Sequence, residues 1–301
     1  MTSFRIILSA SALLPLALAQ RPAEIPSWAP KPAIASKWIP PNKPHTKIAE
    51  VKAKHKGEMD WRELVVDDDH LRAEYVQSKP GAKVGRRFHP DTRAWWVVME
   101  GQIRFEIEGV EPFVATKGSM VQAPMQTIYS METIGDTPSL RFEAGIAKAK
   151  TLYPQDVEPP KIPGVEFIKV RLNRKPGAWD NGNKPHINLR ELAKQPKYRG
   201  GRFVHDDRAV SNIIYGYAKD LPPLDDKNKG HYHPECAEFW LIMAGQIRYP
   251  IEKYGVVIAD EGDVVYVPPF TFHAPRFWGE GASCRLAMNG FTNIAHLFEA
   301  H

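Results

Sequence analysis

Cysteine, clusters of like charge and long apolar runs are all scarce in this sequence. The only two cysteines, Cys236 and Cys284, allow at most one intramolecular disulfide, which excludes a disulfide-stapled scaffold. Forty basic and thirty-five acidic residues give a net charge of +5, but the signs alternate along the chain, so we expect no nucleic-acid partner. No stretch after residue 20 is long and apolar enough to cross a bilayer, so we expect no membrane partner either.

Residues 1–19 predict a cleaved secretory signal. Arg5 precedes an apolar run from Ile6 to Leu18, and the run ends in small residues around Ala19. The run contains Pro15 and is shorter than the roughly 20 apolar residues that a membrane anchor needs. We therefore expect a secreted or periplasmic protein.

Proline is concentrated between residues 20 and 45, which we interpret as an arm before the folded body. Its seven prolines favour an extended backbone and withhold the hydrogen-bond donors that a sheet needs. Trp28 and Trp38 lie in the arm, so either part of it packs on the body or on a neighbouring subunit, or it is a flexible tail.

An internal repeat organises the rest of the chain. The segment 93–105 aligns with 237–249 at a constant offset of 144, and Gly118 and Gly262 correspond at the same offset. Short segments rich in Val, Ile, Phe, Tyr and Trp alternate with Gly, Pro and Asp turns, which predicts an all-β fold.

The repeat predicts two domains, at 46–150 and 165–301, joined by a proline-rich connector at 151–164. A short helix is the one exception to the all-β pattern. Asn188 is a helix-capping residue followed three positions later by Glu191, which predicts a helix start there.

Four potential metal ligands occur in the second unit. His231 and His233 stand at i and i+2, so a strand would point both imidazoles to one face. Glu238 follows a turn that begins at Pro234, and His273 follows a predicted strand and a proline turn. The pattern predicts that all four residues share one ion.

At these residues the sequence resembles the cupin superfamily. The first cupin motif is Gly, five residues, His-x-His, three or four residues, Glu, six residues, Gly. His231, His233, Glu238 and Gly245 match it, although the leading glycine stands directly before His231.

The second cupin motif is Gly, five residues, Pro-x-Gly, two residues, His, three residues, Asn. Gly262, Pro268 and His273 match it, whereas Phe270 and Phe277 replace its Gly and Asn. The resemblance covers roughly residues 60–150 and 200–295. It implies two cupin-type jelly-roll β-barrels in tandem, a bicupin.

Three imidazoles and one carboxylate suit one divalent transition metal: Fe, Mn or Cu, with Ni or Zn also compatible. The first unit has Arg87, His89, Ala94 and Tyr129 at the four ligand positions, so we expect it to hold no metal. It is either a decayed duplicate kept as a packing scaffold or an anion pocket in which Arg87 binds a carboxylate.

Strand alternation after Glu238 predicts which side chains face the metal. Trp240 and Ile242 share its side of the strand, and Phe239 and Leu241 lie on the other. Since both faces are apolar, we expect the outer face to be buried against the other barrel or against a second subunit of a homo-oligomer.

The candidate substrate contacts are Trp240, Phe270, Phe272 and Arg248. Trp240 is either barrel core or a substrate platform, and the phenylalanines beside His273 predict an apolar pocket mouth. Arg248, Arg276 and Arg285 are candidates for binding a carboxylate or an oxyanion.

The resemblance implies a metal-dependent enzyme, and fold alone does not choose the reaction. We expect an oxidoreductase, a dioxygenase or oxidase, acting on a small organic substrate that includes aromatic compounds, with Glu238 and the metal supporting turnover. The alternatives are an oxalate-decarboxylase-like carbon–carbon lyase, which in this superfamily keeps metal ligands in both barrels, and a non-catalytic periplasmic binding cupin.

An oxidising compartment predicts a disulfide between Cys236 and Cys284, since both belong to the second unit. Two separate buried thiols are the alternative.

Overall fold

The computed structural model describes residues 25–177 and 179–300, so the predicted signal at 1–19 and the first residues of the arm lie outside the described residues. The chain divides into a small unit, to which 25–30 and Ala300 belong, and a large unit, Lys31–Glu299. The small unit has no regular secondary structure in its described part, and its Trp28 is fully exposed. All that follows concerns the large unit.

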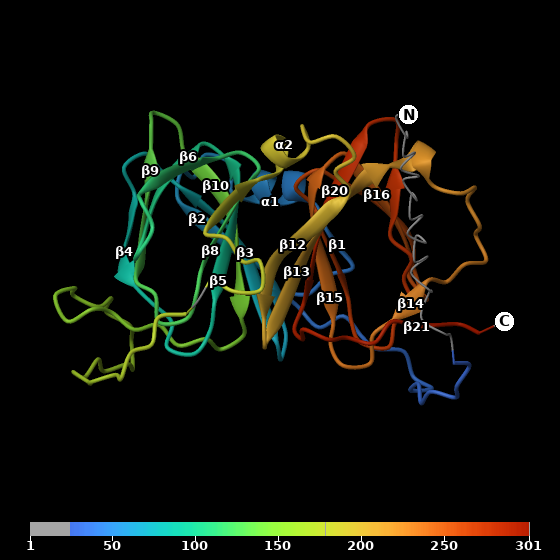
Figure 1. The fold of residues 1–301 in the computed structure, drawn as a ribbon, viewed down its shortest axis with the longest axis horizontal. Helices are drawn as coiled ribbons and strands as arrows, with labels where there is room; N and C mark the ends of the chain where they lie inside the picture. Colours follow the sequence, from blue (N-terminus) through green and yellow to red (C-terminus); the bar gives the residue numbers. More distant parts are fainter. Residues whose placement is uncertain (1–24, 178, 301) are drawn as a thin grey trace, which may run out of the picture. The chain divides into compact units, whose positions relative to one another are not determined.

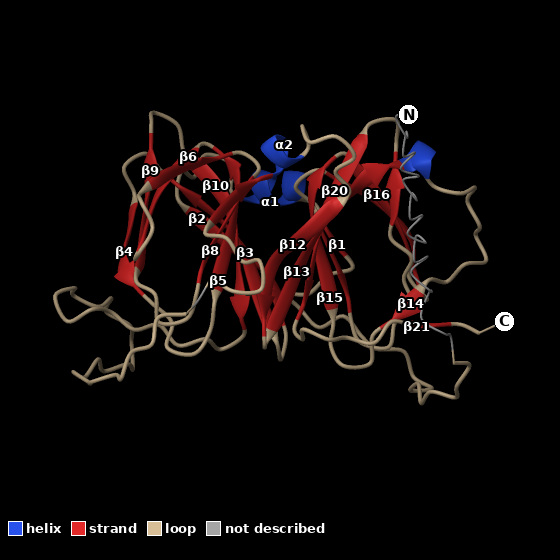
Figure 2. Ribbon diagram, viewed as in Figure 1, coloured by secondary structure: helices blue, strands red, loops and turns tan. Residues whose placement is uncertain are grey.

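Strands dominate the large unit, as the sequence predicted (Figure 2). The first barrel contains β2 (Trp61–Asp67), β3 (Leu71–Ser78), β4 (Lys83–Arg87), β5 (Ala94–Glu100), β6 (Gln102–Ile107), β7 (Phe113–Thr116), β8 (Ser119–Ala123), β9 (Tyr129–Ile134), β10 (Ser139–Ile146) and β11 (His186–Asn188). The second contains β1 (His45–Thr46), β12 (Gly200–Asp206), β13 (Ala209–Tyr217), β14 (His231–Tyr232), β15 (Glu238–Ala244), β16 (Gln246–Ile251), β17 (Gly255–Asp260), β18 (Val264–Val267), β19 (Arg276–Trp278), β20 (Ala282–Asn289) and β21 (Leu297–Phe298).

The two barrels repeat one strand order. The large sheet of the first barrel runs β11-β8-β5-β10-β3-β2, and that of the second runs β1-β18-β15-β20-β13-β12 (Figure 1). A four-stranded sheet, β4-β9-β6-β7, completes the first barrel, and a three-stranded sheet, β17-β16-β19, with the β14-β21 pair, completes the second. The sequence repeat is therefore a structural repeat.

The barrels exchange their outermost strands, which the sequence did not predict. β1 precedes the first barrel in the chain but pairs with β18 of the second, and β11 precedes the second barrel but pairs with β8 of the first. His45 contacts Asp263 at 2.7 Å between Nε2 and Oδ2, and His186 contacts Ser119 at the equivalent place. This exchange ties each half of the chain to the other.

A shared core joins the two large sheets, and we use this name for the buried cluster that contains Tyr75, Phe142, Phe239, Leu241 and Leu286. The Phe142 and Phe239 rings, one from each barrel, lie 6.4 Å apart between centroids. The expectation that the outer face of the β15 strand is covered is confirmed, and the covering element is the first barrel.

Each barrel also has its own interior. In the second barrel the interior contains Trp240, Ile242, Tyr249, Val265 and Ala287, while Phe239 and Leu241 face the shared core. The predicted alternation along β15 is thus correct.

The helices are short; two of them lie between the barrels and the third lies at the far end of the second barrel (Figure 2). The predicted helix is α2 (Leu189–Leu192), where the Asn188 side chain accepts a hydrogen bond from the Arg190 amide, and the 3₁₀ helix is η1 (Ala218–Asp220). Helix α1 (Ile48–Lys54) was not predicted, because its seven residues offer only one buried side chain, Val51. No helix among the described residues has the length and hydropathy of a membrane span.

Part of the arm packs on the second barrel. The Trp38 indole donates a hydrogen bond to the Tyr266 carbonyl at 2.9 Å, and its ring packs against both the shared core and the barrel interior. Of the three possibilities for the arm, packing on the folded body therefore applies to Trp38.

The expected disulfide between Cys236 and Cys284 is wrong, because both are free buried thiols. In the β15–β20 pair Glu238 lies opposite Asn289 and Ala244 lies opposite Cys284. Cys236 therefore stands at the other end of the pair, roughly 17 to 20 Å away at about 3.3 Å per residue. Disulfides need α-carbons within about 7 Å.

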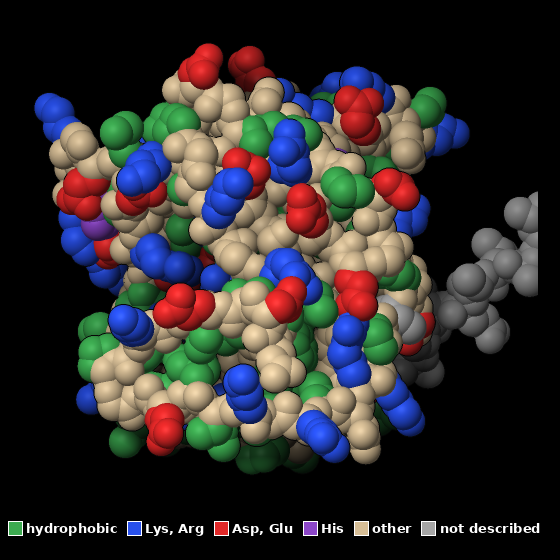
Figure 3. Space-filling view, turned by 90° about the vertical axis from the view of Figure 1, so that its left-hand side faces the viewer, with side chains coloured by type: hydrophobic (Ala, Val, Ile, Leu, Met, Phe, Trp, Pro, Cys, Tyr) green, Lys and Arg blue, Asp and Glu red, His purple; other side chains and the backbone are tan. Residues whose placement is uncertain are grey.

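Charged side chains are mixed on the molecular surface. On the face in Figure 3 the basic and acidic groups are interspersed, without a continuous patch of either sign. Many pair with each other, as Arg86 does with Asp156 and Arg104 does with Glu132.

Candidate metal centre

His231, His233, Glu238 and His273 come together inside the second barrel. One ligand atom from each lies within 4.8 Å of the others, and this is the one cluster of three or more potential ligands in the described part of the chain. His233 and His273 are each 1% exposed and Glu238 is 7% exposed. The structure therefore assembles all four sequence-predicted ligands, and the cluster can hold a metal ion.

Backbone pairing brings the ligands from distant segments together. The amide of His231 donates to the carbonyl of His273 at 3.1 Å, and the amide of His273 donates to the carbonyl of His231 at 2.9 Å. Glu238 begins β15, directly after the turn that separates it from His233. His233 and Glu238 are five residues apart and would point to opposite faces of a continuous strand. The turn instead starts a new strand, whose first side chain faces the imidazoles.

Two of the imidazoles are held in one tautomer. Nδ1 of His233 lies 2.7 Å from the Ala295 carbonyl, and Nδ1 of His273 lies 2.9 Å from the Thr271 carbonyl. Since a carbonyl oxygen only accepts, both Nδ1 atoms must donate, which leaves Nε2 with a lone pair when the ring is neutral. Hydrogen bonds of this kind orient the histidines of metal sites.

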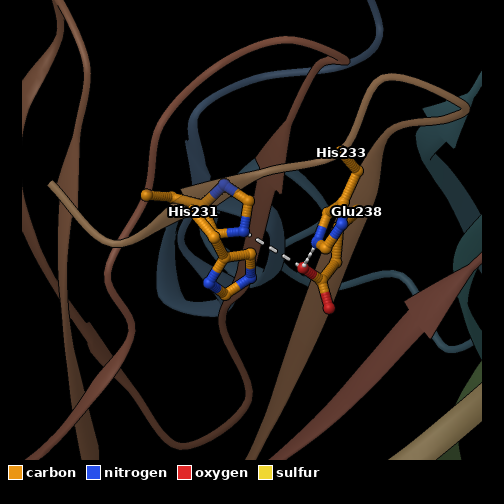
Figure 4. A group of neighbouring side chains, drawn as sticks. His231, His233 and Glu238 are labelled. Atoms are coloured by element: carbon orange, nitrogen blue, oxygen red, sulfur yellow. Dashed lines mark hydrogen bonds and ion pairs between the residues drawn. The ribbon is translucent and has the colours of Figure 1, made fainter. Parts of the chain in front are cut away.

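The Nε2 atoms of His233 and His273 both point at one carboxylate oxygen of Glu238. Oε2 of Glu238 lies 2.9 Å from Nε2 of His233 and 3.1 Å from Nε2 of His273 (Figure 4). A carboxylate and a neutral imidazole nitrogen are both acceptors, so their approach requires a proton or a cation between them. The donor set of three nitrogens and one carboxylate fits a divalent transition metal.

Burial and mutual contact set the charges of the cluster. Burial, with the neighbouring His273, lowers the pKa of His231 to about 3, which keeps this ring neutral as a metal ligand must be. Burial opposes the charges of His233 and Glu238, but their hydrogen bond outweighs it, so the pKa of His233 is raised and that of Glu238 is lowered. The carboxylate is thus held in its charged form.

Gly230 makes the close approach of the ligand segments possible. A β-carbon at Gly230 would lie 2.0 Å from the His273 carbonyl oxygen, and its φ of +75° favours glycine. We expect Gly230→Ala to displace His231 or His273 and to weaken metal binding at least tenfold. Gly81→Ala is the matched control, because Gly81 has the same φ and a β-carbon there would meet no atom within 4 Å.

Both glycine variants carry the backbone cost of a left-handed residue, about 1–2 kcal/mol. Urea unfolding measures the backbone cost, which both variants share. Metal titration by calorimetry measures the effect of the clash on the site, which only Gly230→Ala should show. Equal metal affinity in the two variants would contradict the proposed role of Gly230.

A fourth histidine, His296, lies against the cluster, and sequence analysis missed it. The His296 ring centroid is 4.8 Å from that of His231 and 4.6 Å from that of His233. It arrives on the C-terminal segment, where β21 pairs with β14 and the Phe298 ring contacts His231 at 5.3 Å. His296 lies outside both cupin motifs, so no spacing in the sequence pointed to it.

The candidate substrate contacts separate into three groups. Trp240 is 1% exposed and packs edge-on against His273 at 5.1 Å, so it is part of the barrel core. Phe270 and Phe272 stand near Tyr232, at 6.1 and 5.0 Å between ring centroids, and both keep some exposure.

Arg248 does not join these residues. On β16 the interior side chains are Ile247, Tyr249 and Ile251, so Arg248 lies on the outer face. There it pairs with Asp226 at 2.9 Å and packs over the Trp278 ring.

The first barrel has a different arrangement at the equivalent positions. Nε2 of His89 lies 3.1 Å from the Tyr129 hydroxyl, and its Nδ1 lies 2.8 Å from the Lys150 carbonyl, so both nitrogens are engaged. Arg87, His89 and Tyr129 line a cavity of about 470 Å³. Arg87 packs over the Tyr153 ring, 5.5 Å from its centroid.

No family model and no curated protein sequence matches this chain. Among solved structures it is similar to a cupin 2 conserved barrel domain protein from Leptotrichia buccalis, with a TM-score of 0.55, 12% identity, and coverage of 85% of this chain and 96% of that one. It is also similar to Lactobacillus farciminis oxalate decarboxylase in a formate complex, with a TM-score of 0.50, 14% identity, and coverage of 80% and 84%. These likenesses show the fold, which is two cupin-type β-barrels in tandem.

Proposed function

We propose that this chain is an exported, metal-dependent bicupin enzyme, an oxidoreductase acting on a small organic substrate. The observation that carries the proposal is the convergence of three imidazoles and one carboxylate within 4.8 Å inside the second barrel, with two imidazoles oriented by backbone carbonyls. Sites that are built to bind a metal share this second layer of hydrogen bonds.

Iron, manganese or copper bound here supplies redox or Lewis-acid chemistry. His231, His233 and His273 hold the ion as neutral ligands, and Glu238 contributes one negative charge. A divalent ion with a single carboxylate ligand keeps a net positive charge, which favours an electron-rich or anionic substrate. These four residues would hold the ion, and an ion that takes more than four ligands would still be able to bind that substrate or O2.

Two aromatic side chains pack against the cluster. Trp240 lies beneath His273, and Phe298 covers His231. Phe272 and Tyr232 pack on each other but not on the cluster, because each is the immediate neighbour of a ligand and points to the opposite face of its strand. Trp240 and Phe298 favour a substrate with an apolar part.

Oxalate-decarboxylase-like cleavage of a carbon–carbon bond is the second candidate. The structural likeness to the Lactobacillus farciminis oxalate decarboxylase favours it, but that likeness is one of fold. In contrast to the two-site pattern expected of such enzymes, the first barrel offers His89 alone, and both nitrogens of His89 are already hydrogen-bonded. A binding cupin without turnover is the candidate from another class.

Oxygen consumption separates these candidates. We expect metal-loaded protein to consume O2 in step with substrate loss when it is screened with phenols, diols, keto acids and sugars. Glu238→Gln keeps the shape but removes the negative charge, so it should lower both the metal content and the rate at least tenfold. Arg248→Gln, on the outer face, is the control and should change neither.

Decarboxylation of oxalate without O2 uptake would favour the lyase instead. Tight binding of one compound with no turnover would favour the binding protein.

A further inference from the structure

A buried arginine points into the second barrel. On β20, Cys284, Leu286 and Met288 face the shared core, so Arg285 and Ala287 face the barrel interior. The register agrees, because Arg285 lies opposite Ile242 on β15 and Ile214 on β13, both interior residues. Of the arginines proposed from the sequence, Arg285 is the one on the same side of the sheet as the metal ligands.

The Arg285 side chain makes no hydrogen bond or ion pair within the described residues, although Tyr249 and Glu238 are close enough to interact with its charge. The residue is 9% exposed, its Nε is buried without a hydrogen bond, and no carboxylate pairs with it. Its guanidinium carbon lies 5.4 Å from the centroid of the Phe277 ring. Burial lowers the pKa of Arg285, but a guanidinium stays charged at neutral pH. A buried charge without an ion-pair partner is destabilising, so an anion bound beside Arg285 would be stabilised.

The first barrel shows how the same fold neutralises such an arginine. Arg141 stands at the equivalent place. It lies opposite Val98 in the first barrel, as Arg285 lies opposite Ile242 in the second. Arg285 and Ile242 each follow their counterpart by the repeat offset of 144 residues. Arg141 Nε donates to Glu143 at 2.7 Å and Nη1 donates to Ser78 at 3.0 Å. The residue equivalent to Glu143 is Ala287. The barrel with the metal ligands has therefore kept the arginine without its internal carboxylate.

The second barrel instead gains hydrogen-bond donors. Tyr249 stands where the first barrel has Phe105, and Asn289 stands where it has Gly145. The Tyr249 hydroxyl and the Asn289 amide nitrogen are both buried without a partner. Tyr249 packs on Trp240 at 5.0 Å, and Trp240 packs on His273. Asn289 lies opposite Glu238 on β15, so both donors lie near the metal cluster.

The charges of the interior favour a negatively charged ligand. Glu238 is close enough to Arg285 for their charges to interact, but this carboxylate is already committed to the histidine cluster. With a divalent ion present, the ion and Arg285 together carry three positive charges against one negative charge. A bound carboxylate lowers this excess of positive charge in a region of low dielectric.

The interior can be reached by solvent on this side. Asn212 and Ile214 on β13 share the interior face with Arg285, and both keep partial exposure. Asn289 lies opposite the ligand Glu238 and therefore marks the level of the metal cluster on β20. The backbone of Arg285 is four residues away from it, about 13 Å along the strand. The charges of Arg285 and Glu238 nonetheless interact, so the guanidinium lies within reach of the cluster's field.

We propose that Arg285 and Tyr249 form a subsite that binds the carboxylate of the substrate, with the reactive end of the substrate at the metal cluster. This inference rests on the proposed function, because it assumes that the cluster is the reaction centre. A guanidinium matches a carboxylate with two parallel hydrogen bonds, and the Tyr249 hydroxyl can add a third. The substrate class is therefore a small monocarboxylate with an apolar part.

Calorimetric binding to metal-loaded protein at pH 7 tests the subsite without turnover. The probes are acetate, benzoate and phenylacetate, each compared with its uncharged amide. We expect the wild type to bind a carboxylate at least tenfold more tightly than its amide. Arg285→Met should weaken carboxylate binding about 10- to 100-fold and leave the amide within about threefold, since hydrogen bonds between charged groups are the strong ones.

Ala287→Glu is the sharpest variant, because it supplies the internal carboxylate found in the first barrel. It should remove carboxylate binding while Arg285 remains in place. Tyr249→Phe should weaken binding about three- to tenfold. Arg276→Met is the matched control, because Arg276 lies on the outer face of β19, bonded to the Pro222 carbonyl, and it should bind like the wild type.

Metal content, measured on every sample, separates the two levels of the proposal. A wild type that binds no transition metal would overturn the proposed function. A wild type that binds metal but none of the carboxylates would overturn the subsite alone, and so would equal carboxylate affinity in wild type, Arg285→Met and Ala287→Glu. Should Arg285→Met fail to fold, Ala287→Glu and Tyr249→Phe decide the matter by the same measurement.

Discussion

His233→Ala is expected to empty the metal site, lowering metal content from about one ion per chain to almost none. The residue is buried, its Nδ1 is fixed by the Ala295 carbonyl, and its Nε2 points at Glu238. Losing a residue that merely orients a ligand weakens metal binding 10- to 100-fold, so losing the ligand itself should cost at least about 100-fold. Elemental analysis of the purified protein gives the stoichiometry.

His89→Ala is the matched control, because His89 occupies the position of His233 in the first barrel. Its imidazole is hydrogen-bonded to Tyr129 and to the Lys150 carbonyl, and it has no second imidazole or carboxylate beside it in the motif. The variant should keep its full metal content. Two tightly bound ions per wild-type chain, or metal loss in His89→Ala, would contradict the assignment to one barrel.

Phe239→Ala is expected to destabilise the whole large unit by about 3–5 kcal/mol, the usual cost of removing a buried phenylalanine from a core. Phe239 is fully buried in the shared core and faces Phe142 of the other barrel. Since small domains are stable by about 5–15 kcal/mol, this loss is a large fraction of the total. Urea unfolding followed by fluorescence measures it.

Val256→Ala, at a residue 55% exposed on β17 of the same barrel, should cost less than about 0.5 kcal/mol. Phe142→Ala should destabilise the protein as Phe239→Ala does. The double variant should lose less stability than the two single variants added together, because the two rings share one contact. Strict additivity, or two separate unfolding transitions, would show that the barrels fold independently of the shared core.

The metal ligands were predictable from sequence because their signal is local. His231 and His233 are two residues apart, Glu238 follows one turn later, and His273 ends a short strand–turn segment. Such spacings fix which side chains share a face before any long-range packing is known. Alternation along β15 was predictable for the same reason.

The strand exchange was not predictable, because β1 and β11 have two and three residues. Strands this short carry almost no hydrophobic pattern, and their partners are chosen by long-range pairing. The cysteine pairing failed for a related reason. Membership in one barrel says nothing of distance when two residues lie at opposite ends of paired strands.

By itself, the sequence determined the all-β class, the repeat and the four residues that can hold a metal. Only the tertiary structure decided which barrel face is covered, that His296 approaches the ligands, and which of three arginines points inward. Arg141 and Arg285 look alike in the sequence, and so do many solvated arginines. Burial without an ion pair distinguishes Arg285, because the free energy of a charge depends on everything that surrounds it, including strands distant in the chain.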